Sequence, residues 1–133
     1  MVMLGGCFCG AVRFAADGAP FNSTLCHCTD CRKASGAPAF AWFSVQASTL
    51  RWTAGQPAVF RSSAQALRGF CTGCGTTLTY QSERWPQEID IATGALDDPE
   101  AVPPADHTFV HSRLSWLRLD DGLPQFQTTR TAG

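Results

Sequence analysis

Short hydrophobic segments, separated by turn residues, recur along the whole chain. Apolar and polar side chains alternate in the segments 12–14 and 89–91, and the segment 39–45 (AFAWFSV) is rich in aromatic residues. Pairs such as Gly5-Gly6 and Asp17-Gly18 interrupt these segments at short intervals. Alternation with a period of two between frequent turns is typical of β-strands. The pattern therefore predicts a mostly β fold.

Only one short helix is expected. In the stretch TDCRKAS, the hydroxyl of Thr29 could cap the first turn, and Gly36 would end the helix. The length of 133 residues favours one domain, which we expect to span residues 1–127. We expect the last residues, 128–133, to form a frayed tail.

The charge balance argues against several classes of function. Ten Lys and Arg residues oppose eleven Asp and Glu residues, so the formal net charge is −1. No basic excess or charged block suggests binding to nucleic acid or to a membrane surface. The first residues do not resemble a signal peptide, and no stretch is long enough to span a membrane. These features predict a cytoplasmic protein and leave its oligomeric state open.

Seven cysteines are the most informative residues of this composition. In a reducing compartment, clustered cysteines are more often metal ligands or redox centres than disulfides, and an odd number would leave one thiol unpaired. They form three groups, C-x-C, C-x-C-x-x-C and C-x-x-C, at Cys7 and Cys9, at Cys26, Cys28 and Cys31, and at Cys71 and Cys74. These spacings favour metal ligands over a disulfide framework.

The two outer pairs each have a spacing that lets their thiols converge. In an extended segment, residues two apart face the same side, so Cys7 and Cys9 are expected to hold one ion while Phe8 points away. A C-x-x-C followed by glycine, as in CTGCGT at Cys71 and Cys74, is typical of the tight turn of a zinc ribbon.

Ligand counting predicts two zinc sites of different kinds. A structural zinc is closed by four cysteines, whereas a catalytic zinc keeps one position for water or substrate. Cys26, Cys28 and Cys31, called the triplet below, are local enough to hold one ion. The remaining four cysteines, called the outer cluster, would then meet across a long stretch of chain and hold a structural ion. The second ion, held by the triplet, would offer an open, catalytic position.

Alternatives for the triplet depend on its neighbours. A histidine could close it as a second structural site, although the alternation of side chains turns His27 away from the thiols. His107 and His111 would share one face of an expected strand with Phe109, where a hydrogen-bonded structural role is the simpler interpretation. A redox pair at Cys28-x-x-Cys31 is also possible, although the chain lacks the βαβ pattern of such proteins.

Two cations follow the triplet directly. Arg32 and Lys33 would stabilise nearby thiolates and could attract an anionic substrate. The alternative is that both are solvated surface charges, because this is the usual place of Arg and Lys.

Several motifs together resemble one known family. The stretches GGCFCGAVRF, CHCTDCRKASG and FCTGCGTTL, followed by GALDDP, HTFVHSRLSWL and DDGLPQF, resemble the glutathione-dependent formaldehyde-activating enzyme (GFA) family, whose domain also occurs in centromere protein V. The resemblance implies a β-tent of small antiparallel sheets organised around zinc sites. It also implies a structural zinc at the outer cluster and a catalytic zinc at the triplet.

The resemblance implies an activity as well. The family's named reaction joins glutathione and formaldehyde to S-(hydroxymethyl)glutathione, which is formally a carbon–sulfur lyase reaction. A small thiol such as glutathione and a small aldehyde are therefore the expected partners. A non-catalytic zinc- or thiol-binding module, or a redox protein that uses the triplet, remain the alternatives, because folds and metal sites transfer more readily than substrates do.

Overall fold

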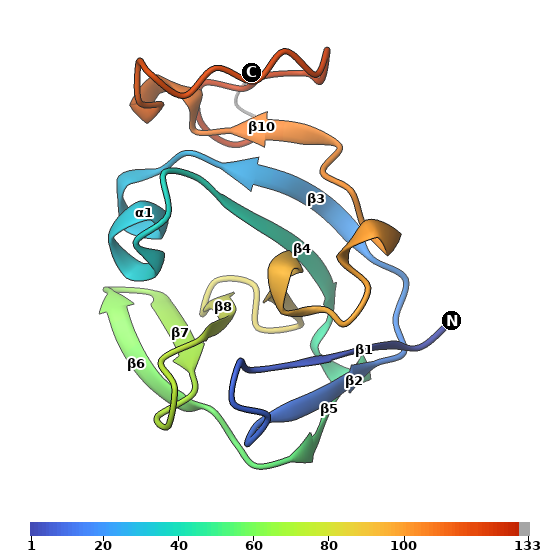
Figure 1. Ribbon diagram of the computed structural model, residues 1–133. Helices are drawn as coiled ribbons and strands as arrows, with labels where there is room; N and C mark the ends of the chain where they lie inside the picture. Colours follow the sequence, from blue (N-terminus) through green and yellow to red (C-terminus); the bar gives the residue numbers. More distant parts are fainter. Residues whose placement is uncertain (131–133) are drawn as a thin grey trace.

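The computed structural model describes residues 1–130 and consists mainly of short β-strands (Figure 1). The ten strands are β1 (Met3–Gly6), β2 (Arg13–Ala16), β3 (Phe21–Cys26), β4 (Phe40–Gln46), β5 (Leu50–Ala54), β6 (Ala58–Ser63), β7 (Ala66–Phe70), β8 (Thr77–Ser82), β9 (Glu88–Ala92) and β10 (Asp106–Thr108). The α-helix is α1 (Thr29–Ser35), and 3-10 turns span Ala47–Thr49, Thr93–Ala95, Pro99–Ala101 and Val110–Ser112. The prediction of a mostly β fold is confirmed. Within residues 1–130, no helix has the length and apolar character needed to cross a membrane.

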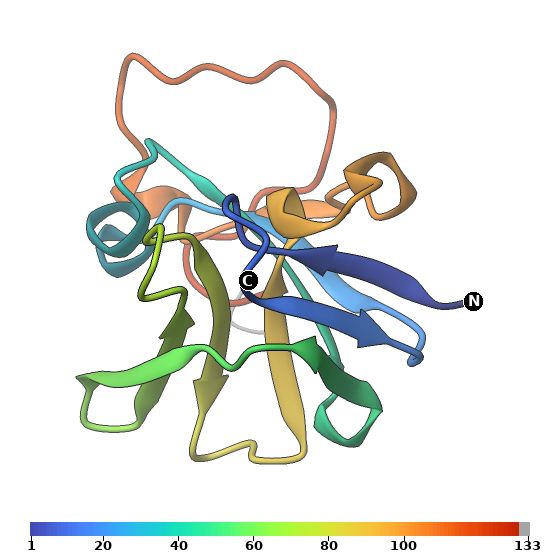
Figure 2. The ribbon, with the colours of Figure 1, turned by 60° about the horizontal axis from the view of Figure 1, so that its bottom comes forward.

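The strands form two sheets. The smaller sheet has the order β1-β2-β5, and the larger has the order β10-β3-β4-β9-β8-β7-β6. Figure 2 shows β1 and β2, in blue, running across the strands of the larger sheet. Neighbouring strands are antiparallel except for β10 and β3, which run parallel. The expected small antiparallel sheets are therefore present, with one parallel pair added at an edge.

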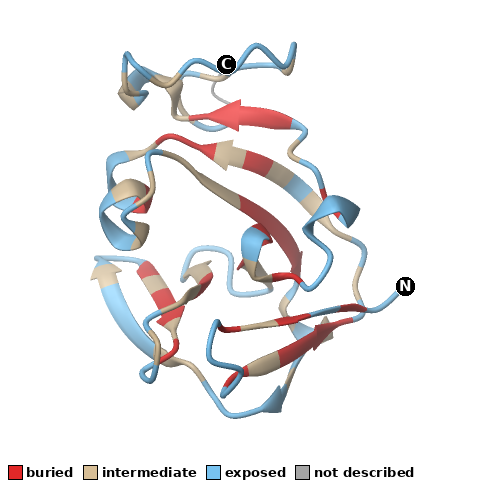
Figure 3. Ribbon diagram, viewed as in Figure 1, coloured by how far each residue is buried: buried red, intermediate tan, exposed pale blue. Residues whose placement is uncertain are grey.

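The main core lies between the two sheets. Phe14 of β2 packs in one buried cluster with Phe43 and Val45 of β4 and Ile91 of β9. In Figure 3 many of the residues of β2 and β4 are marked as buried, whereas α1 is largely exposed. The apolar alternation along β4 and β9 therefore identifies the face of the larger sheet that meets the smaller one.

The opposite face of the larger sheet carries a second buried cluster. Trp42 alternates with Phe43 along β4 and therefore points away from the main core. It packs with Cys26, Cys31 and Ala92, all of which are buried. The triplet is thus built against the face of the sheet that the small sheet does not cover.

The segment after β10 differs from the expected strand. β10 ends at Thr108, and Phe109 has a φ of 56°, in the left-handed region. His111 lies in the 3-10 turn that follows. Because a left-handed residue does not continue a strand, His107, Phe109 and His111 do not share one strand face, and that expectation is wrong.

The C-terminal segment packs beside β10. The amide of Phe109 donates to the carbonyl of Thr128 at 3.0 Å, and Arg130 forms an ion pair with Asp106 of β10 at 2.8 Å. Residues 128–130 are therefore attached rather than frayed, which differs from the expected tail. The rest of that tail, residues 131–133, lies outside the described residues.

Candidate metal centres

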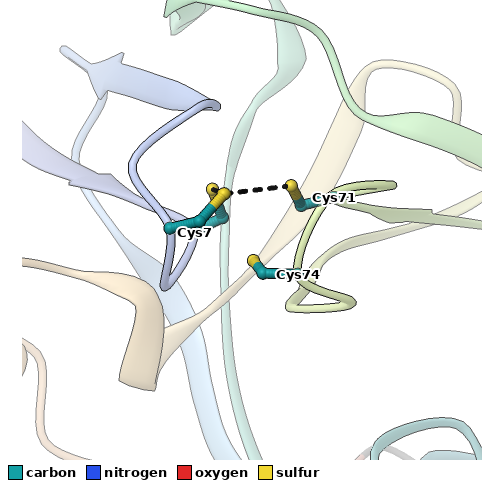
Figure 4. A group of neighbouring side chains, drawn as sticks. Cys7, Cys71 and Cys74 are labelled. Carbon is teal, nitrogen blue, oxygen red and sulfur yellow. Dashed lines mark hydrogen bonds between the residues drawn. The ribbon is translucent and has the colours of Figure 1, made fainter.

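The outer cluster brings together cysteines that are far apart in the sequence. Cys7 and Cys9 lie in the turn after β1, and Cys71 and Cys74 lie in the turn between β7 and β8. Their four sulfur atoms all lie within 4.8 Å of one another. Figure 4 shows the side chains of Cys7, Cys71 and Cys74 pointing toward a common centre. The turn after β1 of the smaller sheet and the turn between β7 and β8 of the larger sheet therefore meet at this cluster.

A compact turn, and not an extended segment, presents the first two thiols. The amide of Cys7 donates to the carbonyl of Val12 at 3.0 Å, and the amide of Gly10, whose φ is 82°, donates to the carbonyl of Cys7 at 3.1 Å. The expected extended geometry is therefore wrong. The expected arrangement of the side chains is nevertheless found, because the sulfur atoms of Cys7 and Cys9 lie close together while Phe8 is 94% exposed.

The second turn has the hydrogen bonds of a tight C-x-x-C-G loop. The amide of Gly75 donates to the carbonyl of Cys71 at 2.8 Å, and the φ of Gly75 is 80°. Thr76 then connects the two turns, because its hydroxyl accepts from the amide of Phe8 at 3.0 Å and lies 3.1 Å from the sulfur of Cys74. Glycine is needed at position 75 because its positive φ strains other residues.

The thiols of the outer cluster have strongly divergent pKa values. Hydrogen bonds from the side chain and backbone of Thr76 lower the pKa of Cys74 to about 5. At Cys9 the amide of Ala11 lowers the pKa, but the neighbouring thiols of Cys7 and Cys74 raise it more, to about 11. Four sulfur donors within 4.8 Å of one another fit a soft divalent ion such as zinc.

The triplet forms at the junction of β3 and α1. Cys26 ends β3, Cys28 is the residue before α1, and Cys31 lies in the first turn of the helix. The three sulfur atoms lie within 4.8 Å of one another. The sulfur of Cys28 accepts from the amide of Cys31 at 3.2 Å and so caps the helix. The predicted helix and its end at Gly36 are confirmed, but the cap is Cys28 and not the hydroxyl of Thr29.

Burial and mutual hydrogen bonding shape the ionisation of the triplet. Cys26 and Cys31 are buried, and Cys28 is half-buried. Hydrogen bonds with Cys28 and Cys31, together with burial, raise the pKa of Cys26 far above its ordinary value. Hydrogen bonds from Cys26 and Cys28, helped by the charge of Arg68, lower the pKa of Cys31 to about 2. The three thiols converge, and the one at Cys31 ionises readily. Such a group of sulfur donors is suited to binding a soft metal ion.

None of the histidines of the described chain joins the triplet. Within residues 1–130 the group contains three cysteines and no histidine or carboxylate. His27 is buried and shares a 2.9 Å hydrogen bond between its Nε2 and Nδ1 of His107, whose Nε2 lies 2.8 Å from Asp121. His111 has its Nδ1 beside the carbonyl of Gln127. The alternative of a site closed by histidine therefore receives no support from this geometry.

Neither of the two cations next to the triplet in sequence has a described contact with its sulfur atoms. Arg32 donates from Nη1 to the carbonyl of Ser112 at 3.1 Å, and Lys33 is exposed on α1. The cation that contacts the triplet is Arg68 of β7, whose Nη1 and Nη2 lie 3.9 and 3.8 Å from the sulfur of Cys31. Sequence reasoning missed Arg68. Its only signal is a charged residue in an otherwise uncharged strand, ALRGF.

Two adjoining cavities lie near the cysteine groups. The larger, of about 790 Å³, is lined by Cys7 and Cys74 of the outer cluster and by Ala34 and Ser35 of α1, among others. The smaller, of about 290 Å³, is lined by Arg68. Both are lined by Ala34, Gly75 and Thr77, so they are neighbours. The cleft therefore runs from the outer cluster toward the helix that carries the triplet.

The fold and these two groups define a β protein with two cysteine clusters that could hold metal ions. The sequence profile of the glutathione-dependent formaldehyde-activating enzyme family matches residues 2–112. The chain therefore belongs to this family, and the resemblance found in its motifs is confirmed.

Two individual proteins are similar to this chain. A Halomonas elongata protein that is named after the same enzyme family is 29% identical over 129 residues, which cover 90% of this chain and 82% of that protein. The crystal structure of a Rhodobacter sphaeroides protein is 22% identical and has a TM-score of 0.59, over 93% of this chain and 99% of that one. At this identity, the second comparison supports the fold alone.

Proposed function

We propose that this protein is a zinc-dependent enzyme of the carbon–sulfur lyase type, similar to S-(hydroxymethyl)glutathione synthase, that acts on the adduct of a small thiol and a small aldehyde. The observation that carries the proposal is the triplet, because three converging thiols without a fourth donor in residues 1–130 are the arrangement of a catalytic zinc site. Family membership supports glutathione and formaldehyde as the substrates.

The proposed reaction needs no oxidant or reductant. The thiol adds to the carbonyl carbon of the aldehyde, a carbon–sulfur bond forms, and the thiol proton ends on the former carbonyl oxygen. The reverse reaction cleaves the same bond. A zinc ion bound at the triplet would supply Lewis acidity and would lower the pKa of a thiol that it binds.

The chain's own residues have separate roles in this proposal. Cys26, Cys28 and Cys31 hold the second ion, and the outer cluster holds a structural zinc that ties the turn after β1 to the turn between β7 and β8. The cleft beside α1 would receive the thiol. Lys33, which is exposed and precedes two residues of the cleft wall, is the better placed of the two predicted cations to meet a carboxylate of glutathione.

Arg32 is the weaker candidate for a substrate contact, because its guanidinium already donates to the carbonyl of Ser112. We propose the cytoplasm as the compartment, since seven unbridged cysteines need reducing conditions to remain metal ligands.

A second candidate function is a non-catalytic zinc- or thiol-binding module. It is favoured by the burial of Cys26 and Cys31 and by the lining of the two described cavities, which includes no cysteine of the triplet. In such a module the second ion would be structural or stored, and the thiol would bind without reacting.

Exchange kinetics separate the two candidates. We expect the zinc-loaded protein to accelerate the interconversion of free and hydroxymethylated glutathione above the uncatalysed rate, saturably with glutathione, as measured by NMR exchange spectroscopy. Cys31→Ser should remove this acceleration because it removes a ligand of the second ion. An uncatalysed rate in the presence of two bound zinc ions per chain would favour the non-catalytic module.

A further inference from the structure

Arg68 is a buried cation that faces sulfur. The residue is 3% exposed, and both terminal nitrogens of its guanidinium lie within 4 Å of the sulfur of Cys31, at 3.9 and 3.8 Å. The third nitrogen, Nε, donates to the hydroxyl of Ser62 at 3.1 Å. Because guanidinium is planar and forked, two of its nitrogens can contact the same acceptor atom, whereas an ammonium group has only one nitrogen.

The sheet holds this guanidinium in place. Arg68 of β7 is directly opposite Tyr80 of β8, and its Cζ lies 4.9 Å from the centre of the Tyr80 ring. The Tyr80 ring in turn lies 6.2 Å, centre to centre, from that of Trp42, which packs with Cys31. These contacts help to fix the orientation of the guanidinium group.

A buried charge needs an opposite charge, and the described carboxylates do not supply one. None of the ion pairs formed within residues 1–130 includes Arg68. Its contacts are a hydroxyl, an aromatic ring and the sulfur of Cys31. Because an unpaired buried charge is strongly unfavourable, the thiolates of the triplet are the counter-charge that this arrangement implies.

We propose that Arg68 is a positioning residue for the second metal ion: it orients the Cys31 thiolate and balances the charge of the triplet. Three thiolates and one divalent ion carry a formal charge of −1, which the guanidinium neutralises. The same cation would make an anionic ligand, such as the thiolate of a substrate, acceptable at the open position. The inference rests on the proposed assignment of the triplet as a metal site.

A metal-binding measurement on the full chain tests this role. The metal-free, reduced protein is titrated with Co²⁺, whose thiolate charge-transfer bands report each site, and zinc affinities follow from competition with a chromophoric chelator. We expect Arg68→Gln to lower the zinc affinity of the triplet by about 10- to 100-fold, which is the usual effect of losing a group that orients a metal ligand. Arg68→Lys, which keeps the charge but not the fork, should fall between Arg68→Gln and the wild type.

Two internal controls separate this role from a general effect on folding. The affinity of the outer cluster should be unchanged in both variants, because Arg68 contacts the triplet and not the outer cysteines. Arg32→Gln removes a cation that is adjacent to Cys31 in sequence but donates to the carbonyl of Ser112. This variant should therefore keep the zinc affinity of the triplet within about threefold of the wild-type value.

The outcomes are distinct. Equal second-site affinity in wild type and Arg68→Gln, or equal weakening of both sites, would overturn the role of Arg68 while leaving the proposed function standing. If Arg68→Gln does not fold, Arg68→Lys decides: selective weakening of the second ion supports the role, and wild-type affinity overturns it. A wild-type chain that binds one ion, at the outer cluster alone, would overturn the proposed function and this inference together.

Discussion

Asp90 of β9 is a carboxyl group on the same face of the larger sheet as Trp42. It is directly opposite Ser44 of β4, whose hydroxyl donates to Oδ1 at 2.6 Å. Burial raises the pKa of Asp90 from 3.8 to about 6, and the hydrogen bond from Ser44 only partly offsets this rise. The folded chain therefore holds a proton at Asp90 more tightly than the unfolded chain does.

This raised pKa predicts a pH dependence of stability. Between about pH 4 and pH 6, Asp90 binds more protons in the folded state than in the unfolded state, so its own contribution to the free energy of unfolding falls as the pH rises through that window. Asp90→Asn keeps an acceptor for Ser44 and removes the charge. We expect it to stabilise the protein by about 1–2 kcal/mol at pH 7.5 and by less at pH 5, as measured by urea unfolding in zinc-containing buffer.

Asp98→Asn is the matched control, because Asp98 is exposed and its side chain caps no helix. Its stability should follow that of the wild type at both pH values. A stabilisation by Asp90→Asn that is as large at pH 5 as at pH 7.5 would contradict the assignment of the effect to this carboxyl group.

Some residues of the candidate site could be predicted from the sequence, and others could not. The seven cysteines could be assigned to two groups by combining spacing with ligand counting: cysteines within one turn converge through local geometry, and the two outer pairs were left to share the other ion. The contact of Arg68 with Cys31 joins residues 37 positions apart, and the contact of His27 with His107 joins residues 80 positions apart. Local spacing carries no information about such pairs, and the nearest cation in sequence, Arg32, was the wrong one to expect beside the sulfur atoms.

At the scale of elements, α1 depends on its two ends. The helix has seven residues, so its backbone hydrogen bonds contribute little without caps. The sulfur of Cys28 satisfies the first turn, and Gly36, with a φ of 74°, donates to the carbonyl of Arg32 and ends the helix. The N-terminal end also positions the triplet, since Cys28 caps the helix and Cys31 lies in its first turn.

Gly36→Ala tests the C-terminal cap. The added Cβ would meet no atom within 4 Å, so the expected cost comes from the left-handed backbone alone, about 1 kcal/mol of unfolding free energy. Gly94→Ala is a matched control, because its Cβ would also meet nothing but its φ is not left-handed, and it should change stability by less than about 0.5 kcal/mol. Equal costs in urea unfolding would show that the backbone conformation at Gly36 does not matter.

The turns show the same division between local and distant causes. Glycine at position 75 after the C-x-x-C pair was a reliable local signal, because its positive φ closes the turn. The turn at Cys7 was expected to be extended, and the sequence alone did not reveal the hydrogen bond from Cys7 to Val12 that folds it back. The strand expected through His111 ends early because Phe109 adopts a left-handed conformation, which aromatic residues seldom do.

At the scale of the whole molecule, the two cysteine groups should differ in their effect on stability. The outer cluster joins turns that are more than sixty residues apart, as in the pair Cys9 and Cys71, separated by 62 positions. An ion bound there would restrict the unfolded chain strongly. The triplet is confined to six residues, from Cys26 to Cys31, and an ion there closes almost no loop.

Loss of one ligand from each group tests this difference. We expect Cys74→Ser to lower the melting temperature by roughly 10 °C or more, and Cys31→Ser to lower it by only a few degrees, each with about one zinc ion lost per chain. Calorimetry and elemental analysis of the reduced proteins measure both quantities. Equal destabilisation by the two variants would contradict a structural outer ion and a functional second ion.

The mostly β class, the single short helix and the membership of the cysteines in two groups followed from period-two alternation, turn residues and ligand spacing. These are local properties, because each involves neighbours that one strand or turn brings together. The meeting of the outer pairs was inferred by counting ligands. Three features depend on how the sheets pack: the parallel pairing of β10 with β3, the cleft beside α1, and the contact of the Arg68 guanidinium with Cys31. Packing brings together residues that are far apart in the sequence, and the local periodicity of the sequence does not predict such contacts.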